Sequence, residues 1–256
     1  MLLGGPARWC TILPMRIWAL SDLHLSLGGD KPMDVFGEHW RDHHVQMAAS
    51  WDEKVAPGDI VLSPGDFSWA GKPNQATADF AWLAERPGRK VLIKGNHDHW
   101  WPKSKTKLAA LLPEQTWALK KHACVIDGVA LFGARGGDFA PLTRYGDKRT
   151  PEQIEAALER EEAELKASIE HLEELRKTES ITLTICLFHY PPLPPGSKHS
   201  RFTPWISHAG ASYCIYGHLH GSEVGNARFE GEIDGVQYRC ASCDQIGFEM
   251  MLVAEV

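Results

Sequence analysis

Five short apolar runs, rich in β-branched residues, recur along the chain and predict buried strands. They occupy residues 16–21, 59–64, 90–94, 181–188 and 212–216. Continuous apolar runs of this length are typical of strands that are covered on both faces. Between the early runs, residues 45–55 and 76–88 have helical patterning. This alternation predicts βαβ units with parallel strands.

Two further segments predict antiparallel hairpins. In residues 123–135 and in residues 231–242, an Asp-Gly pair separates two extended runs. This is the strongest short-range signal for a hairpin. The sequence therefore indicates an α/β fold in which antiparallel strands join parallel ones.

A long amphipathic helix is predicted at about residues 151–177. Thr150 and Gln153 have the spacing of a capping box, and Pro151 suits the first turn. The apolar positions fall on one face: Ile154, Leu158, Leu165, Ile169 and Leu172. Because the other face is charged, we expect this helix to flank the fold. A lid or a contact in a homodimer is the alternative.

Composition narrows the class of protein. The 256 residues carry a net charge of -6, which argues against tight binding of long nucleic-acid duplexes. No apolar run reaches the roughly 18 residues of a membrane span, so we expect no membrane association. The six cysteines lie mostly in apolar runs, as is usual in a reducing cytoplasm. We expect residues 1–14 to be a tail and residues 15–256 to form a single domain.

Polar side chains follow the carboxyl ends of all five predicted strands. In chain order they are Asp22 and His24, then Asp66, then Asn96, His97 and Asp98, then His189, and finally His218 and His220. Ligands bind at this edge of open α/β sheets because the loops converge there. We therefore expect these side chains to meet in one crevice.

The donor set indicates a metal centre. Imidazole mixed with carboxylate and amide oxygen suits manganese, iron, cobalt or zinc better than calcium. The ligand candidates are more numerous than one ion needs, so two ions that share a carboxylate are the economical interpretation. Such a centre keeps a net positive charge and attracts an anion such as phosphate.

These motifs, in this order, resemble the calcineurin-like metallophosphoesterase superfamily. The blocks are Asp22 to His24, Gly65 to Asp66, Gly95 to Asp98, the lone His189, and Gly217 to His220. The resemblance is greatest to small bacterial phosphohydrolases of unassigned substrate. It implies an αββα sandwich, in which two mixed β-sheets pack face to face and are flanked by helices.

The resemblance also implies a role for each motif residue. Asp22, His24 and His220 would hold one ion, Asn96, His189 and His218 would hold the second, and Asp66 would bridge the two. His97 would act on the phosphoryl group, and Asp98 would orient its ring. A metal-bound hydroxide would attack phosphorus. Manganese is the ion that we favour, with iron, zinc and cobalt as alternatives.

One departure from the family pattern bears on the substrate. Many members continue the second motif to Gly-Asp-x-x-Asp, whereas Trp69 stands at the second aspartate here. This favours a phosphodiesterase that acts on a nucleotide, a cyclic nucleotide or a short nucleic acid. A phosphomonoesterase is the alternative within the class. A non-catalytic binding scaffold on the same fold is the alternative outside it.

Further residues near the motifs are candidates for substrate contacts: Trp69, His99, Trp100, Lys198, His199 and Arg201. The tryptophans could stack on a nucleobase or pack the core, and packing is favoured for Trp101. Lys198, His199 and Arg201 lie in the loop after His189 and could contact phosphate or face solvent. Residues 28–40 are expected to help select the substrate, and Cys240 and Cys243 are expected to pack in the core.

Overall fold

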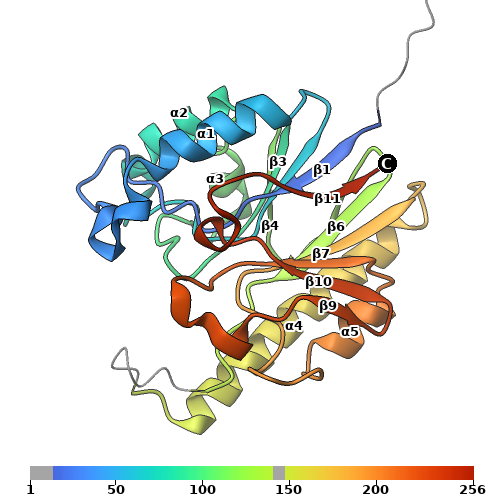
Figure 1. The fold of residues 1–256 in the computed structure, drawn as a ribbon. Helices are drawn as coiled ribbons and strands as arrows, with labels where there is room; N and C mark the ends of the chain where they lie inside the picture. The colour runs from blue at the N-terminus through green and yellow to red at the C-terminus, as the bar shows by residue number, and fades with distance from the viewer. Residues whose placement is uncertain (1–13, 141–147) are drawn as a thin grey trace, which may run out of the picture.

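Two β-sheets form the centre of the protein in the computed structural model, which describes residues 14–140 and 148–256 (Figure 1). In spatial order, the first sheet contains β11 (Met251–Glu255), β1 (Arg16–Ala19), β2 (Ile60–Ser63), β3 (Arg89–Ile93) and β4 (Thr116–Leu119). The second contains β5 (Cys124–Ile126), β6 (Val129–Ala134), β7 (Leu183–Phe188), β8 (Tyr213–Tyr216), β10 (Val236–Cys240) and β9 (Gly231–Ile233).

Both sheets are mixed. Strands β1 to β4 run parallel, and β11 pairs antiparallel with β1. In the second sheet, β6, β7, β8 and β10 are parallel, while β5 and β9 close the two edges as antiparallel partners. The predicted βαβ units and both predicted hairpins are therefore confirmed.

Helices cover the outer face of each sheet. Helices α1 (His43–Lys54) and α2 (Thr77–Glu85) lie against the first sheet, and α4 (Pro151–Leu175) and α5 (Thr203–His208) lie against the second (Figure 1). The shorter elements are α3 (Lys105–Ala109) and the 3₁₀ turns η1 (Met33–Phe36), η2 (Glu38–Trp40), η3 (Pro73–Gln75), η5 (Ser222–Ala227) and η6 (Cys243–Ile246). This is the αββα sandwich that the sequence implies.

Three apolar layers hold the sandwich together. Alternation along β1 sends Trp18 toward α1 and α2, while Ile17 and Ala19 point between the sheets. There they meet inward residues of the second sheet, such as Leu187. The shared layer fixes the two sheets against each other, so that loops from both can build one site.

The long helix has the predicted position and the predicted buried face. All five of its predicted apolar residues are buried against the second sheet. The Thr150 side chain accepts a hydrogen bond from the Gln153 amide, and the Gln153 side chain accepts one from the Thr150 amide. The helix is thus a flank of the fold, as expected.

The sequence patterns do not predict β4, β11, α3 or α5. Strands β4 and β11 form the two edges of the first sheet and are only partly buried. Edge strands have weak apolar patterns because one side lacks a partner strand. The predicted tail falls, except for Pro14, outside the described residues. None of the helices in the described part of the chain is long and apolar enough to cross a membrane.

Truncation at the interface between the sheets should be costly. Leu187 is fully buried there, so Leu187→Ala is expected to lower the free energy of unfolding by about 2–5 kcal/mol, measured by chemical denaturation. Leu252→Ala is the matched control, because Leu252 is 40% exposed on the edge strand β11. It should change stability by less than about 1 kcal/mol. Equal losses would contradict the layered core.

Candidate metal centre

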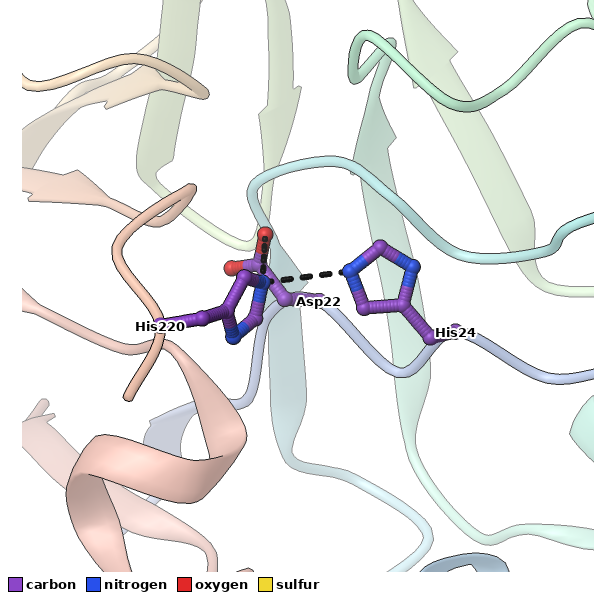
Figure 2. Close-up of side chains that lie close together, drawn as sticks. All are labelled: Asp22, His24 and His220. Atoms are coloured by element: carbon purple, nitrogen blue, oxygen red, sulfur yellow. Dashed lines mark hydrogen bonds and ion pairs between the residues drawn. The ribbon is translucent and has the colours of Figure 1, made fainter. Parts of the chain in front are cut away.

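The polar clusters at the strand ends come together at one edge of the sandwich. Asp22, His24 and His220 form one set, here termed the first ligand group, whose ligand atoms all lie within 4.8 Å of one another. The Nε2 atom of His220 is 3.3 Å from Asp22 Oδ1 and 3.1 Å from His24 Nε2. Figure 2 shows both imidazoles beside the carboxylate. The group joins residues almost two hundred positions apart.

A second set lies beside the first. Asp66, His189 and His218 form the second ligand group by the same 4.8 Å criterion. Asn96 belongs with them, since its Oδ1 is 2.6 Å from His189 Nε2 and 2.9 Å from His218 Nδ1. The seven predicted ligands are therefore all gathered at this edge.

Asp66, a member of the second ligand group, also faces the first. Its Oδ2 atom is 3.5 Å from His189 Nε2 in the second group and 3.8 Å from His24 Nε2 in the first. Its Oδ1 atom accepts a hydrogen bond of 2.7 Å from the His97 amide. One oxygen thus faces both groups while the other is held by the backbone.

The hydrogen bonds of the histidines leave nitrogen lone pairs facing carboxylates. His189 Nδ1 donates to Pro64 O at 3.0 Å, so in the neutral ring Nε2 is an acceptor, and it faces Asp66 Oδ2. His220 Nδ1 is likewise held by Asp244 Oδ1 at 2.9 Å, and its Nε2 faces Asp22. Acceptors that converge on acceptors need a cation between them, so the residues fit divalent ions.

The pKa shifts agree with that need for positive charge. Burial, followed by the charge of Asp22, raises the pKa of Asp66 to about 8. Burial alone would lower the pKa of His220, but its hydrogen bonds and charge pairs with Asp22 and Asp244 raise it to about 10. A proton on His220 thus takes the place that a cation can take. Burial lowers the pKa of His24 and His189, so both rings stay neutral, as ligands must be.

The backbone at the ligands is strained. Asp22, His24, Asp66 and His218 have φ angles of 60°, 46°, 52° and 71°. Side-chain-bearing residues adopt this left-handed region at a cost of about 1–3 kcal/mol each, and such residues cluster at functional sites. The strain turns the chain sharply after β1, β2 and β8, so that side chains from these three loops converge.

Two motif glycines allow the loops to approach closely. A Cβ on Gly95 would overlap both Oδ1 and the amide nitrogen of Asp66. A Cβ on Gly217 would overlap Asp22 Oδ2 and Ser21 Oγ. Glycine is therefore required because a ligand carboxylate from another loop occupies that space.

His97 lies at the rim of the two groups. Its half-buried ring is 4.2 Å from the ring of Trp69 and 5.5 Å from that of His24, measured between ring centres. Burial, followed by the charges of neighbouring imidazoles, lowers its pKa to about 4. The imidazole is therefore neutral at pH 7 and can donate one hydrogen bond.

Asp98 differs from the sequence expectation. Its carboxylate does not bond to the His97 ring among the described residues. It accepts instead from the amides of Asp66, Gly95 and Ser68 and from Trp100 Nε1, at 2.8–3.2 Å. The physical reason is that buried amides of two loops need acceptors, and one carboxylate serves them all. Asp98 shapes the loops and does not orient the His97 ring.

The six candidate substrate contacts divide into three kinds. Trp69 lies at the centre, with its ring stacked on His24 at 4.8 Å. Trp100 is fully buried, so the interpretation that it stacks on a base is wrong and it packs the core, as Trp101 does. Arg201 forms ion pairs with Glu155 and Glu162 of α4. The other three, His99, Lys198 and His199, are exposed.

Three nearby residues were not predicted. Asp244 accepts from His220 Nδ1, Ser242 Oγ donates to Asp22 Oδ2 at 3.0 Å, and the Tyr190 ring lies 4.0 Å from that of His218. Asp244 follows the carboxyl end of β10, which is parallel to β8. Polar residues that follow the carboxyl ends of parallel strands are site candidates, and this criterion applied to β10 would have identified Asp244.

A cavity of about 470 Å³ opens beside the first ligand group. It is lined by residues from two segments, 25–34 and 40–44. The Trp40 ring separates it from the ligands and lies edge-on to His24 and His220, 6.3 and 5.6 Å away. The volume is in the range of small-molecule sites. Much of the predicted substrate-selecting segment, residues 28–40, lines it.

Comparison with known proteins places these features in context. A family model described as calcineurin-like phosphoesterase matches residues 15–222. The gene 66 protein of Mycobacterium phage D29 is 42% identical over 83 residues, which is 32% of this chain and 40% of that protein. The gene 66 protein of Mycobacterium phage L5 is 33% identical over 124 residues, which is 47% of this chain and 58% of that protein. The chain spans about half the length of these curated relatives.

A solved structure is also similar. Phosphopantetheinyl hydrolase from Mycobacterium tuberculosis has a TM-score of 0.54 at 14% sequence identity, and the match covers 94% of this chain and 96% of that chain. At this identity the likeness shows a shared fold alone.

Substitution of Gly95 should damage metal binding. In Gly95→Ala the new methyl group must displace the Asp66 carboxylate, so we expect metal content after dialysis to fall by at least about tenfold, measured by plasma mass spectrometry. Gly58→Ala is the control, since a Cβ there meets no atom within 4 Å. Full metal content in Gly95→Ala would contradict the placement of Asp66.

Asp244 should tune metal affinity through His220. Asp244→Asn replaces the carboxylate that holds His220 Nδ1 by a neutral amide and removes its negative charge from the ring, so it is expected to weaken metal binding about 10–100-fold in a chelator competition assay. Asp234→Asn makes the same change at an exposed position and should bind metal normally. Unchanged affinity in Asp244→Asn would show that Asp244 does not support the centre.

Proposed function

The chain belongs to the calcineurin-like phosphoesterase family, and from that membership we propose that it is a phosphodiesterase with a two-metal centre. The observation that carries the proposal is the position of Asp66, with one oxygen near nitrogens of both ligand groups. Asp22, His24 and His220 would hold one ion, and Asn96, His189 and His218 the other. Bound ions would activate water and neutralise charge on the phosphoryl oxygens.

His97 is the proposed catalytic group of the chain itself. Its backbone is fixed by the bond from its amide to Asp66 Oδ1, so the ring is held at a set position beside the ligands. A neutral imidazole there would donate a hydrogen bond to a phosphoryl oxygen or to the leaving oxygen. Trp69 packs against the ring and limits both its rotation and its contact with water.

Trp69 supports a diester as substrate. It brings an apolar surface to a position where many family members have a carboxylate, often followed by an arginine that binds a dianionic phosphate. A diester carries one negative charge and two organic arms, whereas a monoester dianion needs more compensating charge. The cavity of about 470 Å³ beside Trp40 would take one organic arm, such as a nucleoside. The proposed substrates are nucleotides, cyclic nucleotides or short nucleic acids.

The proposal includes the metal and the compartment. Neutral imidazoles mixed with carboxylates suit manganese, which we favour, although iron, zinc and cobalt share this ligand preference. All five cysteines of the described residues are free, and four of them are buried. Free thiols of this kind suit the reducing cytoplasm, where we propose that the protein acts.

Hydrolysis of matched aryl phosphate esters tests the function. Metal-stripped protein resupplied with manganese should turn over the diester faster than the monoester. His97→Ala should lower kcat about 100–10,000-fold without loss of metal. His208→Ala, an exposed histidine at the end of α5, is the control and should keep wild-type rates.

The other outcomes separate the alternatives. Faster turnover of the monoester would identify a phosphomonoesterase. Metal-loaded wild-type protein without activity on either ester, and with no change on His97→Ala, would favour a binding scaffold.

A further inference from the structure

A second cavity, of about 210 Å³, is lined by residues that include Lys94, two positions before Asn96 in the chain. It is bounded by the ends of β3, β4 and β6 and by α4, and it is here termed the basic cleft. Its charged lining residues are Lys94, Lys103, Lys120, Lys121, Arg135, Glu161 and Glu164. Five cationic side chains therefore face two carboxylates, in a chain whose net charge is -6.

Three of the cations have no carboxylate partner. Lys121 pairs with Glu164 at 3.1 Å, and Arg135 pairs with Glu161 at 3.0 Å. Within residues 14–140 and 148–256, no ion pair joins Lys94, Lys103 or Lys120 to an acidic side chain, and the Lys120 ammonium donates to the Lys103 carbonyl at 2.7 Å. Clefts lined by one sign of charge concentrate counter-ions. The unpaired lysines thus give the basic cleft an excess of positive charge, which attracts anions.

The basic cleft continues from the metal centre along the chain. Lys94 lies directly before Gly95 and the ligand Asn96. The Arg135 carbonyl accepts hydrogen bonds from the amides of His189 and Tyr190, at 3.1 and 2.9 Å. An anion in the basic cleft would therefore lie close to a phosphate held at the second ligand group.

We propose that the basic cleft binds a phosphate of the substrate other than the one that is cleaved, namely the neighbouring backbone phosphate of a short single-stranded nucleic acid. This inference rests on the proposed phosphodiesterase function and narrows its substrate. Lysine ammonium groups hold backbone phosphates without reading sequence. Because five cationic side chains line the cleft, binding should favour short strands, with little dependence on base identity.

Calorimetric binding of thymidine oligomers tests the inference. Metal-loaded protein that carries His97→Ala, and so turns over slowly, should bind a hexanucleotide about tenfold more tightly than a dinucleotide. Adding Lys94→Gln and Lys103→Gln should remove most of this difference. The double change should also lower the salt-dependence slope for the hexanucleotide by about 0.7, the value for loss of one phosphate contact on a single strand. Lys103→Gln alone, at an exposed position, should remove about half of the length preference. This single variant tests the inference if Lys94→Gln impairs folding.

The matched control removes the same charge elsewhere. Lys54→Gln with Lys177→Gln acts on lysines that pair with Glu249 and Glu174, and it should keep the tenfold preference. Equal affinity for both oligomers, or equal loss in the control, would overturn the inference. So would inorganic phosphate that abolishes the preference at concentrations comparable to the oligomer, since it would show a site for the free ion.

Hydrolysis separates this inference from the proposed function. Lys94→Gln with Lys103→Gln, in protein with intact His97, should cleave the small aryl diester at wild-type rates, because that substrate has no second phosphate. If the His97→Ala protein shows no length preference while the wild type cleaves the aryl diester, only the inference is overturned. If the wild type is inactive on the aryl diester, the proposed function fails, and the binding series still decides whether the basic cleft holds a strand.

Discussion

Charge compensation among buried ligands is the interaction on which this structure depends. Asp22 and Asp66 are almost completely buried, and burial of an unpaired carboxylate costs several kcal/mol. Each carboxylate faces imidazole nitrogens from other strands. The arrangement is stable only with positive charge between the groups, supplied by a proton or a metal ion. The strained ligands and the close-packed glycines follow from the same convergence.

The sandwich provides the rigidity that this convergence needs. The apolar layer between the sheets fixes the ends of β1, β2 and β3 against those of β7 and β8. Backbone hydrogen bonds then join the sheets at the site itself, from Ser21 to Ala241 and from Cys243 to Ser21. A ligand group can therefore combine residues 22 and 220, although its geometry must be held within about 0.5 Å.

Sequence patterns predicted the strands, the hairpins and α4 because each has a strong local signal. They also identified the seven ligand candidates that the structure gathers at one edge, because short motifs at strand ends carry their own chemistry. They failed where a role depends on partners distant in the chain. Asp98 meets amides 30 and 32 residues away, and Asp244 meets His220 across 24 residues. The sequence left open whether Trp100 stacks on a base or packs the core, and tertiary packing buries it completely.

Anomalous diffraction from crystals of manganese-loaded protein can show whether Asp66 joins two metal sites. We expect two metal peaks for each chain. One should contact Asp22, His24 and His220, the other should contact Asn96, His189 and His218, and the Asp66 carboxylate should contact both. A single peak, or two peaks of which only one contacts Asp66, would contradict the claim that Asp66 joins two metal sites.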